Sequence, residues 1–436
     1  MPWLPLNPAL LRLGLYIKID HPWLDHPFVR NVFTVSSPTE IAIIRKYHLN
    51  RLFYDTERSH ADVVAAITDP SASVEEFQID AETAQDAEAD EQSILKEKEK
   101  QIQSILQHRK EVEENTRTYI DARNEISVML AMANAGQADM LRTATKIMGS
   151  LDNALQQKDV AISLVCAESN GEPGQELAMQ AMNVSALAVL TAKTMGLVPE
   201  EIERVGMGAL LHNIGMSRVP LAVRVKSEED MSPTETKLLR MYPQLGKEIL
   251  EVIPGMDAEV VEIVHQHREW IDGTGYPKRL FAGDINKLAR LVGVIVEYNA
   301  MTSDRRSPRY LGPGQALSHL YAKMQHKYGP DVIDAFIATV TVFPPGSFVE
   351  LSDGSFGLVL KCNLDERLRP IVMLYERQAS HEQAAIIDLA RERSLSIERS
   401  IDTKTLPERV KNALLPTKLN GYVLTTTQKK PEGGNG

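Results

Sequence analysis

The spacing of apolar and polar residues predicts a small α+β module over residues 1–70. Leu13 to Asp20 alternates as a half-buried strand does, and Leu52 to Tyr54 predicts a second strand. Between them, Ser37 to Tyr47 has a proline near its start and then apolar residues at helical spacing. His21 to Phe28, HPWLDHPF, holds two histidines and an aspartate that could ligate a metal. We favour a loop that packs its Trp and Phe instead.

Residues 71–137 predict an acidic linker followed by a long helix. No Lys or Arg occurs from Ser59 to Leu95, and so acidic a stretch buries too little apolar surface to offset its chain entropy, which predicts a mobile linker. Lys96 to Leu130 is rich in Glu, Lys, Gln and Arg, and its apolar residues include a seven-residue repeat. The repeat comprises Ile105, Val112, Tyr119 and Ile126. This helix either pairs with a second chain, giving a homodimer, or folds back on its own domain.

The pattern over residues 138–342 predicts a domain that is helical almost throughout. Apolar spacing of three and four occurs in Met182 to Leu197, Val205 to Leu211, Thr236 to Ile253, Ala258 to His267, and Lys287 to Met301.

Residues 343–415 predict a small β module. Ser347 to Val359 reads as two strands around a Ser-Asp-Gly turn, and Pro370 to Tyr375 as a third strand. Residues 416–436, which end in KKPEGGNG, predict a disordered tail. The predicted fold class is therefore mainly α, with small β-containing modules on either side of the helical domain.

Composition narrows the classes of function. The chain has 436 residues, enough for two or three domains. Its formal net charge of −11 argues against nucleic acid as a partner. Cys166 and Cys362 form no CxxC pattern, and no apolar run reaches the length of a membrane span. We expect a cytoplasmic protein that neither crosses nor binds a membrane.

Two segments carry the candidate chemistry, LLHNIGMSRVP at Leu210 to Pro220 and VHQHREWIDGTGYP at Val264 to Pro277. They resemble the signatures HDIGK and HHExxDGxGYP of the HD-GYP family, bacterial metal-dependent phosphodiesterases that act on cyclic di-GMP. His21 to Phe28 resembles the N-terminal module that often precedes such domains. The resemblance implies an HD-type helical domain over residues 138–342.

The resemblance also implies a cluster of metal ligands, and most of those positions are altered in this sequence. A metal cluster that activates water for phosphodiester hydrolysis needs several anionic or imidazole ligands. Only two of the implied ligands remain, His212 and His267. The altered family positions are Asn213, Met216, Tyr242, Arg268, Val296, Asn299 and, less securely, Gln180. We therefore expect no catalytic residues and no metal cofactor; an active enzyme of this family would hold two or three Fe or Mn ions.

A shifted site is an alternative to a lost one. His265 and Glu269 lie four residues apart and share a helix face, and Glu297 neighbours Val296. A residue displaced by one position on a helix points about 100° away from its neighbour, so Glu297 should not replace the ligand that Val296 lacks. We favour a packing role for His265.

The loop half of the signature is intact. Its glycines permit positive φ, its proline stiffens the exit, and its tyrosine ring could stack on a base. The residues expected to bind a ligand or partner are Asp272, Gly273, Gly275, Tyr276, Pro277 and Arg305. The resemblance implies either cyclic di-GMP or a signalling protein, such as one with a diguanylate cyclase domain, as the partner.

Our hypothesis from the sequence is a catalytically degenerate HD-GYP protein that acts in cyclic di-GMP signalling through this loop. Two alternatives stay open. One is an active or residual metal-dependent phosphodiesterase, and the other is an interaction scaffold that binds no nucleotide.

Overall fold

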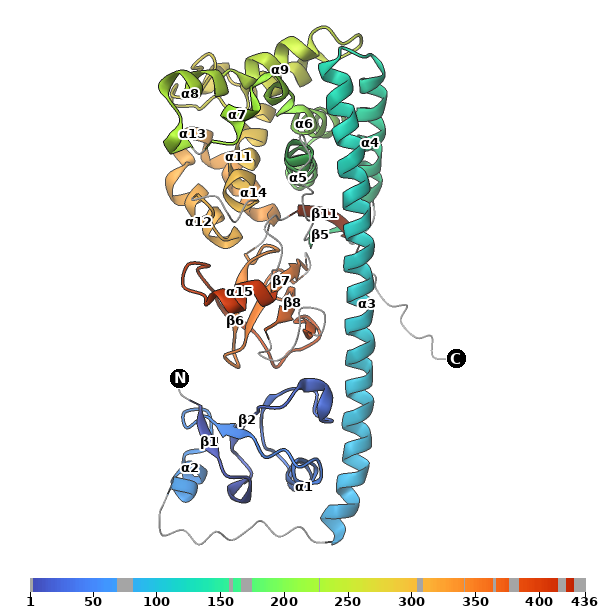
Figure 1. Cartoon of the computed structure of the whole chain (residues 1–436), viewed down its shortest axis with the longest axis vertical. Coiled ribbons are helices and arrows are strands. Elements are labelled where there is room, and N and C mark those ends of the chain that lie inside the picture. The colour runs from blue at the N-terminus through green and yellow to red at the C-terminus, as the bar shows by residue number, and fades with distance from the viewer. Residues whose placement is uncertain are drawn as a thin grey trace. The chain divides into compact units, whose positions relative to one another are not determined.

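The computed structural model describes residues 3–68, 81–156, 160–165, 175–226, 228–303, 309–340, 342–363, 366–375, 384–414 and 421–426. The chain forms two compact units that divide within the long helix α3, between Arg109 and Lys110 (Figure 1). The fold is mainly α, as the sequence predicts, with the predicted small sheets in both units. None of the helices in the described part of the chain is both long and apolar enough to cross a bilayer.

The N-terminal unit contains a four-stranded antiparallel sheet of order β1-β4-β2-β3. The strands are β1 (Leu4–Leu6), β2 (Tyr16–Ile19), β3 (Val32–Thr34) and β4 (Leu52–Tyr54), and the helices are α1 (Pro38–Lys46) and α2 (Ala61–Thr68). A capping box between Ser37 and Glu40 fixes the start of α1. The predictions for β2, α1 and β4 are confirmed, whereas β1 and β3 were not predicted.

Helix α3 (Ala81–Asn134) begins within the predicted acidic linker, so the expectation of a mobile linker is wrong for residues 81–95. Two of the acidic side chains there have partners in α1 or at its C-terminal end. Glu91 accepts hydrogen bonds from Lys46 and Tyr47 at 2.7 and 2.8 Å, and Thr39 donates to Asp90 at 2.6 Å. Acidic residues near a helix N-terminus also interact favourably with the helix dipole.

The HPWLDHPF segment packs against α3 within the same unit. Trp23 and Phe28 are buried, and the Trp23 indole donates to the carbonyl of Val29 at 2.8 Å. Lys98 of α3 is buried too and donates to the carbonyls of Trp23 and His26. The segment is thus a packed loop, as we favoured.

The C-terminal part of α3 folds back on its own unit. Tyr119, Ile126 and Met129 are fully or almost fully buried, and the Tyr119 hydroxyl donates to Asn183 Oδ1 at 3.2 Å. Tyr119 and Ile126, two residues of the predicted seven-residue repeat, therefore pack within the chain. Pairing with a second chain through the rest of the helix stays a prediction.

The helical part of the second unit is built around α5 (Gln175–Thr194), which is buried along most of its length. It packs against α4 (Asp139–Gln156), α6 (Pro199–Leu211), α11 (Lys287–Thr302) and α14 (Pro330–Val340). The other helices of this part are the 3₁₀ helix η3 (Ile214–Arg218), α7 (Leu221–Arg224), α8 (Pro233–Leu239), α9 (Tyr242–Leu250), α10 (Ala258–Gln266), α12 (Pro313–Lys323) and α13 (Gln325–Tyr328). The single helix predicted over Thr236 to Ile253 is two helices, because α9 restarts at Tyr242 with Pro243 in its first turn.

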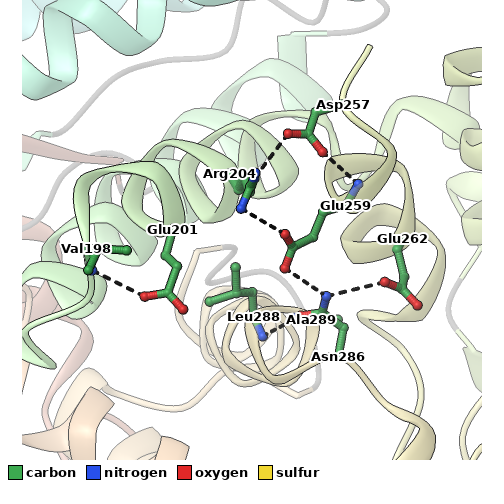
Figure 2. Close-up of polar contacts among 9 residues, drawn as sticks. All are labelled: Val198, Glu201, Arg204, Asp257, Glu259, Glu262, Asn286, Leu288 and Ala289. Carbon is green, nitrogen blue, oxygen red and sulfur yellow. Dashed lines mark hydrogen bonds and ion pairs between the residues drawn. The ribbon is translucent and has the colours of Figure 1, made fainter.

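A polar network fixes the N-terminal ends of α10 and α11 beside α6 (Figure 2). Arg204 of α6 contacts Asp257 at 3.0 Å and Glu259 at 3.1 Å. Asn286 caps α11 by accepting from the amide of Leu288 at 2.8 Å, and its amide nitrogen donates to Glu259 at 3.3 Å. These contacts join the starts of α10, which leads to His267, and of α11, which carries Glu297.

The second sheet has the order β10-β6-β7-β5-β11, with β8 also paired to β7 and β9 to β8. The elements are β5 (Val160–Val165), β6 (Phe348–Leu351), β7 (Phe356–Lys361), β8 (Ile371–Leu374), β9 (Ile386–Asp388), β10 (Ile397–Ser400), α15 (Glu408–Leu414) and β11 (Gly421–Thr426). The predicted hairpin and third strand are confirmed, and Gly354 adopts the positive φ that the turn requires.

Two predictions near this sheet are wrong. Val160–Val165 is a strand inside the segment predicted to be helical, and Gly421–Thr426 is a strand inside the predicted disordered tail. They pair antiparallel with each other over six residues, which satisfies backbone groups of both. The rest of the tail lies outside the described residues, and the predicted domain boundaries stay predictions.

Candidate functional site

The two remaining histidines of the signature lie next to each other in the helical domain. His212 ends α6 and His267 ends α10, and their ring centroids are 5.5 Å apart in an edge-to-face arrangement. Both are buried. Each Nδ1 lies 2.7 Å from a carbonyl of its own helix, that of Ala209 or of Val264, which leaves Nε2 as the nitrogen available to a ligand.

At His267 that nitrogen already has a partner from the altered positions. Tyr242, the first residue of α9, places its hydroxyl 2.7 Å from His267 Nε2. Arg268 Nε donates to the same hydroxyl at 2.8 Å, and Arg268 Nη1 donates to Glu297 of α11 at 3.1 Å. A continuous polar chain, which we call the Tyr242–Arg268–Glu297 chain, therefore lies against His267.

The aspartate positions of the family pattern are also part of the helix packing. Asn213 donates its amide to the carbonyl of Leu177 at 2.8 Å. Asn299 accepts at 3.2 Å from Asn183, which in turn accepts from Tyr119 of α3 at 3.2 Å. Val296 is buried and offers no donor atom. Reasoning from the sequence missed Asn183 and Tyr119 as neighbours of the site, because a polar residue inside a helix gives no sign of a contact on another helix.

The DGTGYP segment forms a tight loop after α10. Asp272 Oδ1 accepts from the amide of Thr274 at 2.9 Å, and Gly273 has a φ of 75°. A Cβ on Gly275 would lie 2.3 Å from the amide nitrogen of Trp270, so this position requires glycine. The Tyr276–Pro277 peptide bond is cis.

The ring of Tyr276 is half-buried at the rim of the site. Its centroid lies 6.4 Å from that of Tyr242, and the exposed Arg240 guanidinium lies 5.6 Å from its ring. Met216 packs against the same small apolar cluster as Tyr276. Arg240 did not emerge from the sequence, and Arg305, which did, lies outside the described residues.

Comparison with known proteins places the chain in a family. The HD domain model matches residues 158–332, a model for a domain of unknown function matches 7–144, and a KOW domain associated with the HD domain matches 348–409. A cyclic di-GMP phosphodiesterase of Pseudomonas aeruginosa is 27% identical over 373 residues, which cover 84% of this chain and 83% of that protein. The chain is an HD-GYP protein.

Two further similarities cover smaller or more divergent parts. A cyclic di-GMP phosphodiesterase response regulator of Xanthomonas campestris is 30% identical over 155 residues, which cover 35% of this HD-GYP protein and 41% of that protein. A solved structure of a HDG"Y"P protein from Bdellovibrio bacteriovorus is 18% identical and covers 77% of this chain and 98% of that one, with a TM-score of 0.33.

Burial sets the protonation states at the site of this HD-GYP protein. Burial, and then the nearby Arg268 charge, lower the pKa of His212 to about 4. Burial, the His212 ring and Arg268 hold the pKa of His267 well below its usual value, and burial raises that of Tyr242. Near neutral pH both imidazoles are therefore uncharged and the tyrosine keeps its proton. The Tyr242 hydroxyl then donates to His267 Nε2 and accepts from Arg268.

His265, Glu269 and Glu297 were considered as ligands of a shifted metal site. The two carboxylates are bonded to other groups of the protein, and His265 is buried. Glu297 binds Arg268, and Glu269 accepts from the backbone amides of Lys278 and Leu280, just after the DGTGYP loop. His265 is buried, and burial followed by the charges of Lys247 and Lys278 lowers its pKa to about 4.

The residues present do not fit a metal cluster. Across the described residues, no three or more His, Cys, Asp or Glu side chains gather where they could hold a metal ion. A divalent cation at His267 would also have to displace the Tyr242 hydroxyl beside the permanent charge of Arg268.

Proposed function

We propose that this HD-GYP protein acts in cyclic di-GMP signalling as a binding protein without phosphodiesterase activity, and that the DGTGYP loop is its binding element. The observation that carries the proposal is the Tyr242–Arg268–Glu297 chain, in which the Tyr242 hydroxyl occupies Nε2 of His267 and the Arg268 guanidinium bonds to that hydroxyl. The ligand class is suggested by the similar proteins, which are named cyclic di-GMP phosphodiesterases.

We expect no hydrolysis because the site has too few atoms that could ligate a metal ion. Attack on a phosphodiester near neutral pH needs a cation that converts water to hydroxide and neutralises charge on the phosphoryl oxygens. Two imidazoles alone cannot hold the two or three Fe or Mn ions that family chemistry implies. Arg268 could neutralise phosphate charge, but a guanidinium does not activate water.

The groups around Tyr276 favour binding of a guanine nucleotide. Its aromatic ring and the Arg240 guanidinium offer a stacking surface and a planar hydrogen-bond donor, the groups that a guanine nucleotide requires. No carboxylate within the described residues forms an ion pair with Arg240, whereas the nearby Lys226 is paired with Glu235. Arg240 can therefore bind a phosphate without first breaking an ion pair.

Isothermal titration with cyclic di-GMP tests the proposal. We expect the wild-type protein to bind and Tyr276→Ala to weaken binding roughly tenfold or more, because one stacked base contributes about 1–3 kcal/mol. The matched control is Tyr321→Ala, which removes a tyrosine that is 57% exposed on α12. A wild-type protein that gives no heat would contradict nucleotide binding and leave a protein partner, such as one with a diguanylate cyclase domain, to be sought by pull-down.

A residual phosphodiesterase is the competing function, and one observation favours it. His212 and His267 keep the close arrangement that two ligands of one cation would need, with ring centroids 5.5 Å apart. This alternative predicts bound Fe or Mn and conversion of cyclic di-GMP to pGpG or GMP.

A further inference from the structure

Glu269 is a buried carboxylate that the candidate chemistry does not use. It follows Arg268, three residues after the end of α10, and is 1% exposed. No Lys, Arg or His of the described chain forms an ion pair with it. A charge in such a position is tolerated only when hydrogen bonds satisfy it.

The bonds that satisfy Glu269 come from the exit of the DGTGYP loop. One carboxylate oxygen accepts from the backbone amide of Lys278 at 2.5 Å, and the other accepts from that of Leu280 at 2.9 Å. These amides lie two and four residues beyond Tyr276. Both oxygens of a single side chain therefore hold the segment that follows the loop.

Tyr276 and the glycine before it also contact the backbone of Arg268 and Glu269. The amide of Tyr276 donates to the carbonyl of Arg268 at 3.0 Å, and Gly275 packs so closely that a Cβ there would lie 2.6 Å from Glu269 Cα. Tyr276 thus lies between a contact with the Arg268 backbone and the contacts with the Glu269 side chain.

We propose that Glu269 is the positioning residue of the DGTGYP loop and holds Tyr276 in place for its ligand without a metal ion. The ligand part of this inference rests on the proposed function, and the positioning part rests on the two hydrogen bonds alone. A carboxylate is required because a glutamine would present an NH₂ group to one of the two amides, and two donors cannot bond to each other.

The test is amide hydrogen exchange on the full-length protein, comparing Glu269→Gln with wild type. We expect exchange at Lys278 and Leu280 to speed up at least tenfold, while core amides of α11 such as Ile295 keep their protection. The matched control is Glu251→Gln, which makes the same chemical change at an exposed residue that forms an ion pair with Lys247. Unchanged exchange at Lys278 and Leu280, or an equal increase throughout the protein, would overturn the positioning role.

A second measurement on the wild-type protein covers the case in which Glu269→Gln does not fold. Adding Mn²⁺ after treatment with a chelator should leave exchange at Lys278 and Leu280 unchanged, because the carboxylate belongs to the loop. Protection that appears only with Mn²⁺ would show Glu269 acting with a metal and would overturn the inference.

Titration with cyclic di-GMP separates the two proposals. If the wild type binds, we expect Glu269→Gln to weaken binding roughly tenfold while Glu251→Gln does not. Undiminished affinity in Glu269→Gln would overturn the inference alone. A wild type that does not bind would contradict the proposed function, while the exchange result would still decide the positioning role.

Discussion

Arg268 stands where the HD-GYP pattern has the second histidine of a pair, and its side chain joins α9 to α11 through Tyr242 and Glu297. The side chains of Arg268 and Glu297 are only 17% and 23% exposed. Removing one partner of such a pair leaves the other charge poorly solvated.

The first prediction follows from this burial. Arg268→Ala should lower the free energy of unfolding by about 1–3 kcal/mol. The control Arg218→Ala breaks a more exposed ion pair, of 3.8 Å with Glu248, and should cost less than about 1 kcal/mol. Urea unfolding of the two variants makes the comparison. Equal losses would mean that Arg268 is an ordinary surface residue.

The second prediction concerns pH. His212 has a pKa of about 4 in the folded protein, below the value of about 6.5 expected when unfolded. The unfolded chain therefore binds a proton that the folded one does not between these values. The stabilisation is complete above pH 6.5 and is lost as the pH falls to 4.

Unfolding free energies at pH 7.5 and pH 5 measure this effect. The wild type should lose about 2 kcal/mol more than His212→Leu over that interval. His319→Leu, which removes an exposed histidine, should keep the wild-type dependence. If His212→Leu and wild type lose the same free energy, His212 does not titrate as described.

At the residue scale, the sequence predicts which residues lie at the candidate site but not which of them contact one another. His212, His267 and the altered positions could be found because the motifs fix their place in the chain. That Tyr242 would bond to His267, and Arg268 to both Tyr242 and Glu297, could not be predicted, because these contacts depend on side-chain rotamers and on how three helices pack.

At the scale of elements, α3 is the helix that brings a distant part of the sequence to the site. Its Tyr119 bonds to Asn183 of α5, and Asn183 bonds to Asn299 of α11. All three residues are buried, so this network fixes the position of α3 against the helical domain.

The third prediction tests that network. Tyr119→Phe keeps the ring but removes the hydroxyl that Asn183 accepts from, and should cost about 1 kcal/mol of unfolding free energy. Tyr321→Phe makes the same change at a tyrosine that is 57% exposed and should cost close to nothing. Thermal or urea unfolding suffices to compare them. The same small effect in both variants would argue against a structural role for the network.

The elements that the sequence predicted are those with a clear local period, such as α1, β4 and α11. The failures have physical causes of their own. Residues 81–95 were misjudged because composition averages over a whole segment, whereas a helix needs only one face to find partners, as Glu91 does on α1. The pairing of β5 with β11 joins strands far apart in the chain, and a short apolar run does not reveal its partner.

At the scale of the whole molecule, the chain has the domain content of an HD-GYP protein, and we propose that the altered ligand positions at the centre of its helical domain remove the family's chemistry. Family models match the helical domain and the regions on either side of it. Fold alone does not establish chemistry, because activity depends on the particular side chains at the site. The polar groups at the centre are bonded to one another and join α9, the end of α10 and α11.

Metal content and cyclic di-GMP hydrolysis, measured on one preparation of the full-length protein, test the central claim most directly. We expect no stoichiometric Fe or Mn after purification with these metals present in the growth medium, and no pGpG or GMP formed from cyclic di-GMP. Bound metal in stoichiometric amounts, together with hydrolysis that a chelator abolishes, would contradict the account.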